Sequence, residues 1–167
     1  MISGKIAKLW LLAAGILIFS FSSCTKVHTR SQADEDAEIA EFLATNDTLH
    51  FQHTASGLYF LNLEVGTGLQ PATHDSVFVI HTIGLLTGPI VYTNEGTTDT
   101  LEVPVNEGLL IPGFEEGLTY MKAGGKALLL VPSTLAYGST GYLNIAGYTP
   151  LIIKIYLARV RPYPFSK

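Results

Sequence analysis

Apolar and polar residues follow a helical period around residue 40 of the chain. Three large apolar residues recur on what would be one helical face: Ile39, Phe42 and Leu43. Ahead of them, Ser31 and Asp34 have the spacing of a capping box. Negative charges follow in the first turns, where a helix dipole favours them, at Asp34, Glu35, Asp36 and Glu38. We predict an amphipathic helix over about residues 31–45, whose apolar stripe docks onto the domain or onto a partner chain.

From Gly57 onward the period changes to that of strands. Alternation and runs of β-branched residues predict four strands, over residues 59–65, 76–86, 126–132 and 150–160. Glycine, proline and aspartate separate them. After Gly113, apolar residues return to helical spacing at Phe114, Leu118 and Met121. The pattern predicts an α+β fold in which an antiparallel sheet wraps one short helix.

The N-terminus has a different composition. Lys5 and Lys8 precede an apolar run over residues 9–21, which ends in Ser22, Ser23 and Cys24. A membrane-spanning helix needs about 20 such residues, so the run is better matched to the apolar core of a signal peptide. We predict a signal peptide over residues 1–23 and a polar tether over residues 24–30; a short membrane anchor is the alternative.

Cys24 is the only cysteine, which excludes a disulfide within one chain. The sequence from Phe21 to Cys24 resembles the lipobox of bacterial lipoproteins, which implies that Cys24 becomes a lipidated N-terminus. Several acyl chains on one residue would anchor it stably. Ordinary cleavage with a leftover thiol is the alternative. The expected location is therefore a bacterial membrane, with the domain on the outer membrane facing the periplasm.

The charge of the predicted mature chain narrows the class of partner. Beyond residue 23 there are eight Lys and Arg against 14 Asp and Glu, a net charge of −6. Nucleic-acid binding requires a basic surface, so we expect no nucleic-acid partner. A length of 167 residues suits one compact domain with an appendage.

Two features carry candidate chemistry. Glu115 and Glu116 are neighbours, and adjacent residues on a helix do not face each other, so they cannot form a catalytic carboxylate pair. They are expected to begin a helix and to satisfy its free N–H groups. Four of the five histidines are candidates for a metal site, His50, His53, His74 and His81, but they lack the spacing of a metal motif, so we expect no metal or cofactor. His81, within an apolar strand, is expected to be a satisfied core residue.

Residues 109–141, LLIPGFEEGLTYMKAGGKALLLVPSTLAYGSTG, resemble the FK506-binding protein (FKBP) family of peptidyl-prolyl cis-trans isomerases. Two upstream segments add to the resemblance, SGLYFLNLEVGTGLQP and VIHTIGLL. It implies a half barrel around one helix. The implied organisation is a helix and linker over residues 31–55, an isomerase domain over residues 56–161 and a tail over residues 162–167.

The resemblance also implies a substrate pocket. Tyr137 matches the tyrosine that hydrogen-bonds the substrate carbonyl, and Ile111 matches an isoleucine whose backbone N–H does likewise. Leu110 matches the neighbouring valine, and Phe114 replaces the tryptophan that usually floors the pocket.

Other pocket positions depart from the family pattern. Thr82 stands where the family has a tyrosine, and Val91 and Tyr92 stand where it has phenylalanine and aspartate. Leu101 and Ile153 replace two further phenylalanines. Tyr92 either fills the space of the missing groups or offers its own hydroxyl.

Two functions follow from this mixture. Tyr137 and Ile111 favour a prolyl isomerase that acts on proline-containing polypeptides and assists the folding of exported proteins, with activity lowered by a degenerate pocket. Thr82, Val91 and Tyr92 favour a non-catalytic binding or chaperone module on the membrane surface. In either case the N-terminal helix is a possible homodimer contact.

Overall fold

A computed structural model of the chain describes residues 30–164. The predicted signal peptide, Cys24 and nearly all of the tether lie outside the described residues. Within residues 30–164, no helix has both the length and the apolar character needed to cross a membrane.

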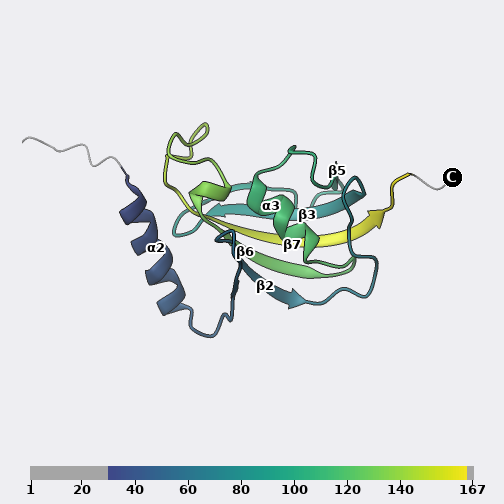
Figure 1. The fold of residues 1–167 in the computed structure, drawn as a ribbon, viewed down its shortest axis with the longest axis horizontal. Helices are drawn as coiled ribbons and strands as arrows, with labels where there is room; N and C mark the ends of the chain where they lie inside the picture. The colour runs from purple at the N-terminus through teal and green to yellow at the C-terminus, as the bar shows by residue number, and fades with distance from the viewer. Residues whose placement is uncertain (1–29, 165–167) are drawn as a thin grey trace, which may run out of the picture.

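One antiparallel sheet of seven strands forms the body of the molecule (Figure 1). Its order is β1-β2-β6-β7-β3-β4, and β5 also pairs with β3. The strands are β1 (Gln52–His53), β2 (Tyr59–Glu64), β3 (Ser76–Leu85), β4 (Ile90–Thr93), β5 (Leu101–Pro104), β6 (Lys126–Val131) and β7 (Leu151–Arg161). The helices are α2 (Gln32–Thr45), α3 (Pro112–Thr119) and the 3₁₀ turn η1 (Ser133–Leu135). The predicted α+β fold is confirmed, and β1, β4 and β5 are additional to the predicted strands.

Helix α3 lies against one face of the sheet because two glycines let it approach closely. A Cβ at Gly117 would meet Leu129 Cδ1 at 2.5 Å, and one at Gly113 would meet Val131 Cγ1 at 2.5 Å. These glycines are four residues apart and therefore share one face of the helix. The predicted apolar residues Phe114, Leu118 and Met121 are all buried in the main core.

Strand β2 exists as predicted, but its two faces differ in burial. Leu58 and Phe60 point into the core. Leu63 and Val65, apolar residues in the range 59–65 that was predicted as a strand, are 49% and 70% exposed. Alternation therefore identified the strand without identifying its core face.

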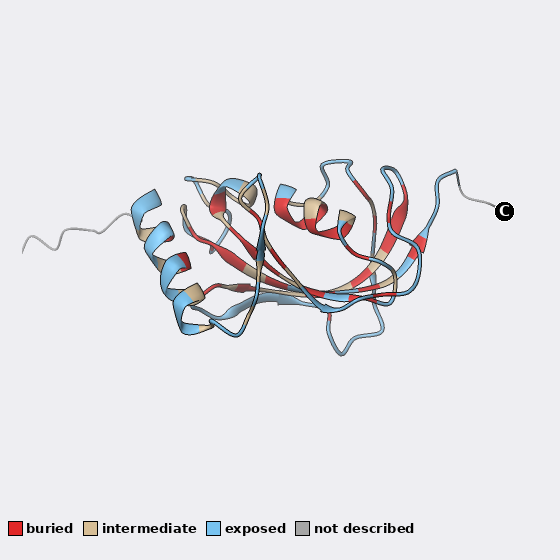
Figure 2. Cartoon of the chain, turned by 60° about the horizontal axis from the view of Figure 1, so that its bottom comes forward, coloured by how far each residue is buried: buried red, intermediate tan, exposed pale blue. Residues whose placement is uncertain are grey.

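Helix α2 packs on the face of the sheet opposite α3, as the alternation of Leu129 and Leu130 along β6 shows: Leu129 belongs to the main core and Leu130 contacts the α2 cluster. In that cluster Ile39 is buried, and Phe42 and Leu43 pack beside it. Glu35, one turn earlier, is buried as well, and Figure 2 shows most of the other face of the helix exposed. The capping box is confirmed, since Ser31 N–H donates to Asp34 Oδ2 at 2.8 Å. We predicted that the apolar stripe docks either onto the domain or onto a partner chain, and it docks onto the domain.

Candidate functional site

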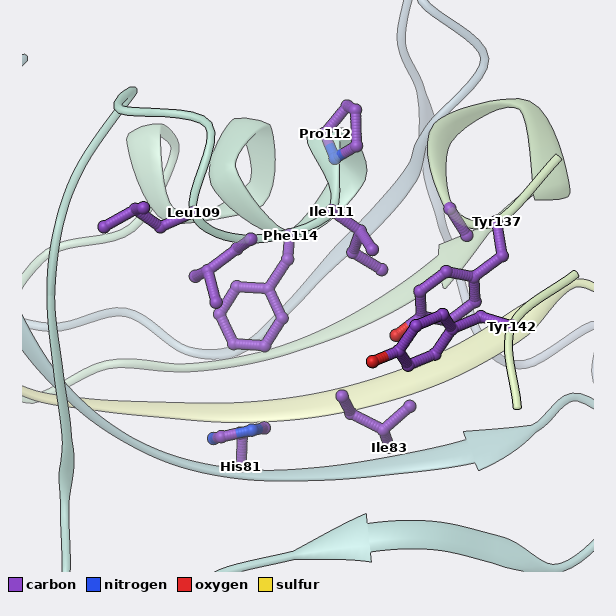
Figure 3. A pocket seen from close by; sticks show the side chains of 10 residues that line it. His81, Ile83, Leu109, Ile111, Pro112, Phe114, Tyr137 and Tyr142 are labelled. Atoms are coloured by element: carbon purple, nitrogen blue, oxygen red, sulfur yellow. The ribbon is translucent and has the colours of Figure 1, made fainter. Parts of the chain in front are cut away.

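A cavity of about 460 Å³ opens between β3, the start of α3 and the loop after η1 (Figure 3). It is lined by His81, Ile83, Leu109, Leu110, Ile111, Pro112, Phe114, Ala136, Tyr137 and Tyr142. Four residues named from the family resemblance therefore meet in one cavity: Leu110, Ile111, Phe114 and Tyr137.

Phe114 and Glu115 build the floor and one wall. The Phe114 ring is 1% exposed and meets the His81 ring edge to face, with centroids 5.2 Å apart. The buried Glu115 carboxylate accepts hydrogen bonds from the backbone N–H groups of Gly108, Leu109 and Leu110, at 3.3, 3.0 and 3.2 Å. Glu115 thus braces the cavity wall.

The carboxylate pair begins a helix, as predicted, but does not satisfy the helix N–H groups in the way expected. The N–H groups that Glu115 satisfies belong to the preceding loop. Glu116 points to the surface, where its oxygens accept from the hydroxyls of Ser56 at 2.6 Å and Tyr120 at 3.0 Å. Because the two carboxylates serve different segments, they do not act as a pair.

Tyr137 and Tyr142 form the opposite wall. Their rings stack with centroids 5.1 Å apart, and Figure 3 shows both hydroxyls directed into the cavity. Burial, followed by the proximity of Tyr142, raises the pKa of the Tyr137 hydroxyl above its ordinary value. Tyr137 is therefore a neutral donor at physiological pH.

Ile111 supplies a second donor from the backbone. It is the N-cap of α3, with an extended conformation (φ −61°, ψ 144°). Its carbonyl accepts from Phe114 N–H and Glu115 N–H, whereas no acceptor among residues 30–164 takes its own N–H. The sequence places Pro112 next, which fits the first position of a helix because proline has no N–H to leave unpaired.

On β3 the pocket residues are His81 and Ile83, and the structure does not place Thr82 at the cavity. Thr82 lies on the other face of the strand, where its hydroxyl is 2.7 Å from that of Thr93. The inward set along β3 is Val77, Val79, His81 and Ile83. A strand alternates its side chains between faces, so the buried valines could have identified His81 as the inward residue.

His81 also differs from the satisfied core residue that we expected. It is 6% exposed, and within the described chain its Nδ1 has no hydrogen-bond partner. Burial lowers its pKa, so the imidazole is neutral at physiological pH. The pocket therefore contains an unpaired polar atom beside Phe114 and the Tyr92 ring, whose centroid is 5.1 Å away.

Val91 and Tyr92 line a second groove of about 380 Å³ that adjoins the cavity and shares Ile83, Tyr137 and Tyr142 with it. They are 44% and 50% exposed. Tyr92 is a wall of this groove and does not fill the cavity.

The last two predicted pocket residues line neither space. Ile153 is fully buried in the core, and Leu101 packs at the edge of that core.

The described residues offer no cluster of three or more His, Cys, Asp or Glu side chains suited to a metal ion. The histidines have other neighbours. His53 stacks on Tyr59 with centroids 4.2 Å apart, and His74 pairs with Glu107. The chemistry available in the cavity is thus an apolar enclosure with neutral hydrogen-bonding groups.

Comparison with known proteins points to one family. Residues 68–158, more than half of the chain, match the family described as FKBP-type peptidyl-prolyl cis-trans isomerase. The chain is 36% identical over 129 residues to the FKBP-type isomerase FkpA of Buchnera aphidicola, covering 75% of this chain and 48% of that protein. It is 34% identical over 107 residues to the outer membrane protein MIP of Legionella longbeachae, covering 64% and 45%.

A solved structure agrees with the sequence relatives. The crystal structure of FkpA from Escherichia coli matches with a TM-score of 0.68 and 27% identity, over 80% of this chain and 63% of that chain. The chain spans about half the length of the curated relatives it matches. Together with the half-barrel sheet around α3, these matches show that the chain belongs to the FKBP-type peptidyl-prolyl cis-trans isomerase family.

Proposed function

We propose that the chain catalyses cis-trans isomerisation of X-Pro bonds in polypeptides. The observation that carries this proposal is the meeting of the Tyr137 hydroxyl and Ile111 in one apolar cavity floored by Phe114. The X-Pro bond resists rotation by roughly 18–20 kcal/mol because resonance keeps the amide planar. A catalyst must therefore bind the twisted amide more tightly than the planar one.

The cavity suits that task by its composition. The planar amide is polar because of its charge-separated resonance form, and the twisted amide loses that form. Transfer from water to an apolar cavity therefore costs the planar amide more solvation free energy than the twisted amide, which lowers the barrier between them. The Tyr137 hydroxyl and the Ile111 N–H are donors that hold carbonyl oxygens of the substrate while the bond turns. No covalent intermediate is required.

Turnover should be slower than in typical family members. No acidic side chain lines either the cavity or the adjoining groove in the described chain. Val91 and Tyr92 occupy the positions where the family resemblance implies phenylalanine and aspartate, and both are about half exposed. The open apolar groove beside the cavity is the observation that favours the second candidate function, a module that binds polypeptides without turning them over.

The proposed location is the membrane surface outside the cytoplasm, with exported proteins as clients. It rests on the apolar segment over residues 9–21, the lipobox-like approach to Cys24 and the tether over residues 24–30. A relative named as an outer membrane protein supports an exported protein. A homodimer through α2 would have to use the exposed face of that helix, because its apolar stripe packs on the sheet.

Kinetics on a short X-Pro peptide test the proposal. We would measure kcat/KM for the wild type, Tyr92→Phe and the double variant Val91→Phe/Tyr92→Asp. A slow wild type that the double variant accelerates supports a degenerate isomerase pocket. A fast wild type that Tyr92→Phe slows would instead show that the Tyr92 hydroxyl acts in the reaction. Binding without acceleration by the wild type and by both variants would reject catalysis and leave the binding module.

A further inference from the structure

Helix α2 and Arg30, which lies just before it, are hydrogen-bonded to the two ends of the loop that carries the pocket tyrosines. Glu35, which is fully buried, accepts from the backbone N–H of Ser133 and from the Ser133 hydroxyl, the latter at 2.6 Å. At the other end, Arg30 donates to the carbonyl of Tyr148 from Nε at 3.1 Å and from Nη2 at 3.0 Å. Arg30 also pairs with Glu38 of α2.

Inside the loop, two backbone hydrogen bonds complete a closed circuit. Gly138 N–H donates to the Ser133 carbonyl at 2.7 Å, and Tyr148 N–H donates to the Gly138 carbonyl at 2.9 Å. The circuit therefore runs from Glu35 through Ser133, Gly138 and Tyr148 to Arg30, and returns through Glu38 to the helix. Tyr137 is the residue next to Gly138, at the centre of this circuit.

The loop backbone needs such restraint. Tyr148 has φ +54°, a left-handed conformation that costs free energy for a bulky residue and persists where the surroundings hold it. Both polar groups of its backbone are bonded, one to Gly138 and the other to Arg30. The hydrogen bonds from Arg30 and to Gly138 therefore help to hold Tyr148 in this conformation.

A buried carboxylate is costly unless its interactions compensate, so the burial of Glu35 requires an explanation. In the first turn of α2 a carboxylate interacts favourably with the helix dipole. That interaction does not explain the burial of Glu35, because Asp34 and Asp36 beside it are not buried. Its bonded partners other than Gln32 are the two donors of Ser133, 98 residues away in sequence. Glu35 thus serves the pocket loop.

We propose that Glu35 and Arg30 are positioning residues for the proposed isomerase reaction, and that α2 helps to set the geometry of the pocket. They fix the base of the 133–148 loop and hence the position of the Tyr137 hydroxyl. The proposal rests on the proposed function for its kinetic consequence, whereas its structural consequence stands independently of turnover.

Amide hydrogen exchange on the full chain gives the direct test, with Glu35→Ala, Arg30→Ala and Glu35→Gln as variants. In Glu35→Ala we expect exchange at Ser133 and Gly138 to rise about tenfold more than at central β7 amides such as Ile155, because two bonds to a charged acceptor are lost. Arg30→Ala should have its largest effect at Tyr148. Glu35→Gln keeps an acceptor for Ser133 N–H and should largely restore protection.

The matched control is Ile39→Ala, which removes buried packing from the same helix without touching the hydrogen-bond circuit. It should lower protection across the sheet and leave kcat/KM of the folded protein unchanged. Glu35→Ala should lower kcat/KM about tenfold, mainly through kcat, with Glu35→Gln near the wild type. If Glu35→Ala and Ile39→Ala give the same exchange pattern, α2 only stabilises the fold and the proposal is overturned. A wild type without isomerase activity would reject the proposed function but leave the exchange test intact.

Discussion

Replacing Glu115 should weaken both the fold and the pocket, because this buried carboxylate is the acceptor for three backbone N–H groups of the cavity wall. Hydrogen bonds to charged groups contribute roughly 1.5–3 kcal/mol each, so three would give an upper bound of about 4.5–9 kcal/mol. The actual loss should be smaller. Gly108 and Leu109 are exposed, so their N–H groups can turn to water once the carboxylate is gone. We expect Glu115→Ala to lower the free energy of unfolding by about 2–4 kcal/mol.

Glu115→Gln separates charge from shape. Leu109 and Leu110 both donate to Oε1, which the amide oxygen can replace, whereas the amide nitrogen would face Gly108 N–H and lose that bond. The expected cost is about 1 kcal/mol. Urea denaturation measures both variants, and kcat/KM should fall with them because Leu110 and Ile111 belong to the braced wall. The control is Glu116→Ala, whose surface carboxylate should cost about 0.5 kcal/mol or less. Equal losses for Glu115→Ala and Glu116→Ala would refute the bracing role.

The remaining predictions concern four separate residues. Tyr137→Phe should lower kcat/KM about 10–100-fold with an unchanged melting temperature, and an unaffected rate would remove Tyr137 from the mechanism. Ile39→Ala should cost about 2–5 kcal/mol in urea denaturation, and a loss below 1 kcal/mol would mean that α2 docks weakly. Burial lowers the pKa of His81, so the unfolded chain takes up its proton first as pH falls below about 6.5, and stability should decline there in the wild type but less in His81→Asn. Intact mass of the membrane fraction should show acyl chains on Cys24; an unmodified thiol contradicts the anchor.

The sequence correctly predicted the features that depend on residues close together in the chain. The capping box of Ser31 and Asp34 depends on a spacing of three residues, and it forms as expected. Phe114 and Leu118 follow the period of one helix, and both reach the core. The family resemblance likewise brought Tyr137 and Ile111 to one cavity, because their motifs fix short turns whose geometry the sequence specifies.

Contacts between distant segments could not be predicted in the same way. From the sequence, Glu35 was expected only to interact favourably with the helix dipole. Its hydrogen bonds to Ser133 could not be predicted, because they form only where the fold places α2 beside η1. On β3 a difference of one residue decides whether Thr82 or His81 faces the pocket, and a short motif did not fix that parity. Ile153 is another position that the resemblance did not place correctly: its aliphatic side chain is buried in the core and does not line the pocket.

The most direct test follows one X-Pro peptide by NMR, measuring exchange with a catalytic amount of the full chain and binding with an equimolar amount. Uncatalysed exchange between the cis and trans peptide takes tens to hundreds of seconds. Exchange cross-peaks between the two forms within about one second would show catalysis, and we expect them with the wild type and much weaker ones with Tyr137→Phe. Peptide resonances that shift on binding while cis and trans exchange stays at the uncatalysed rate would contradict an isomerase and identify a binding module.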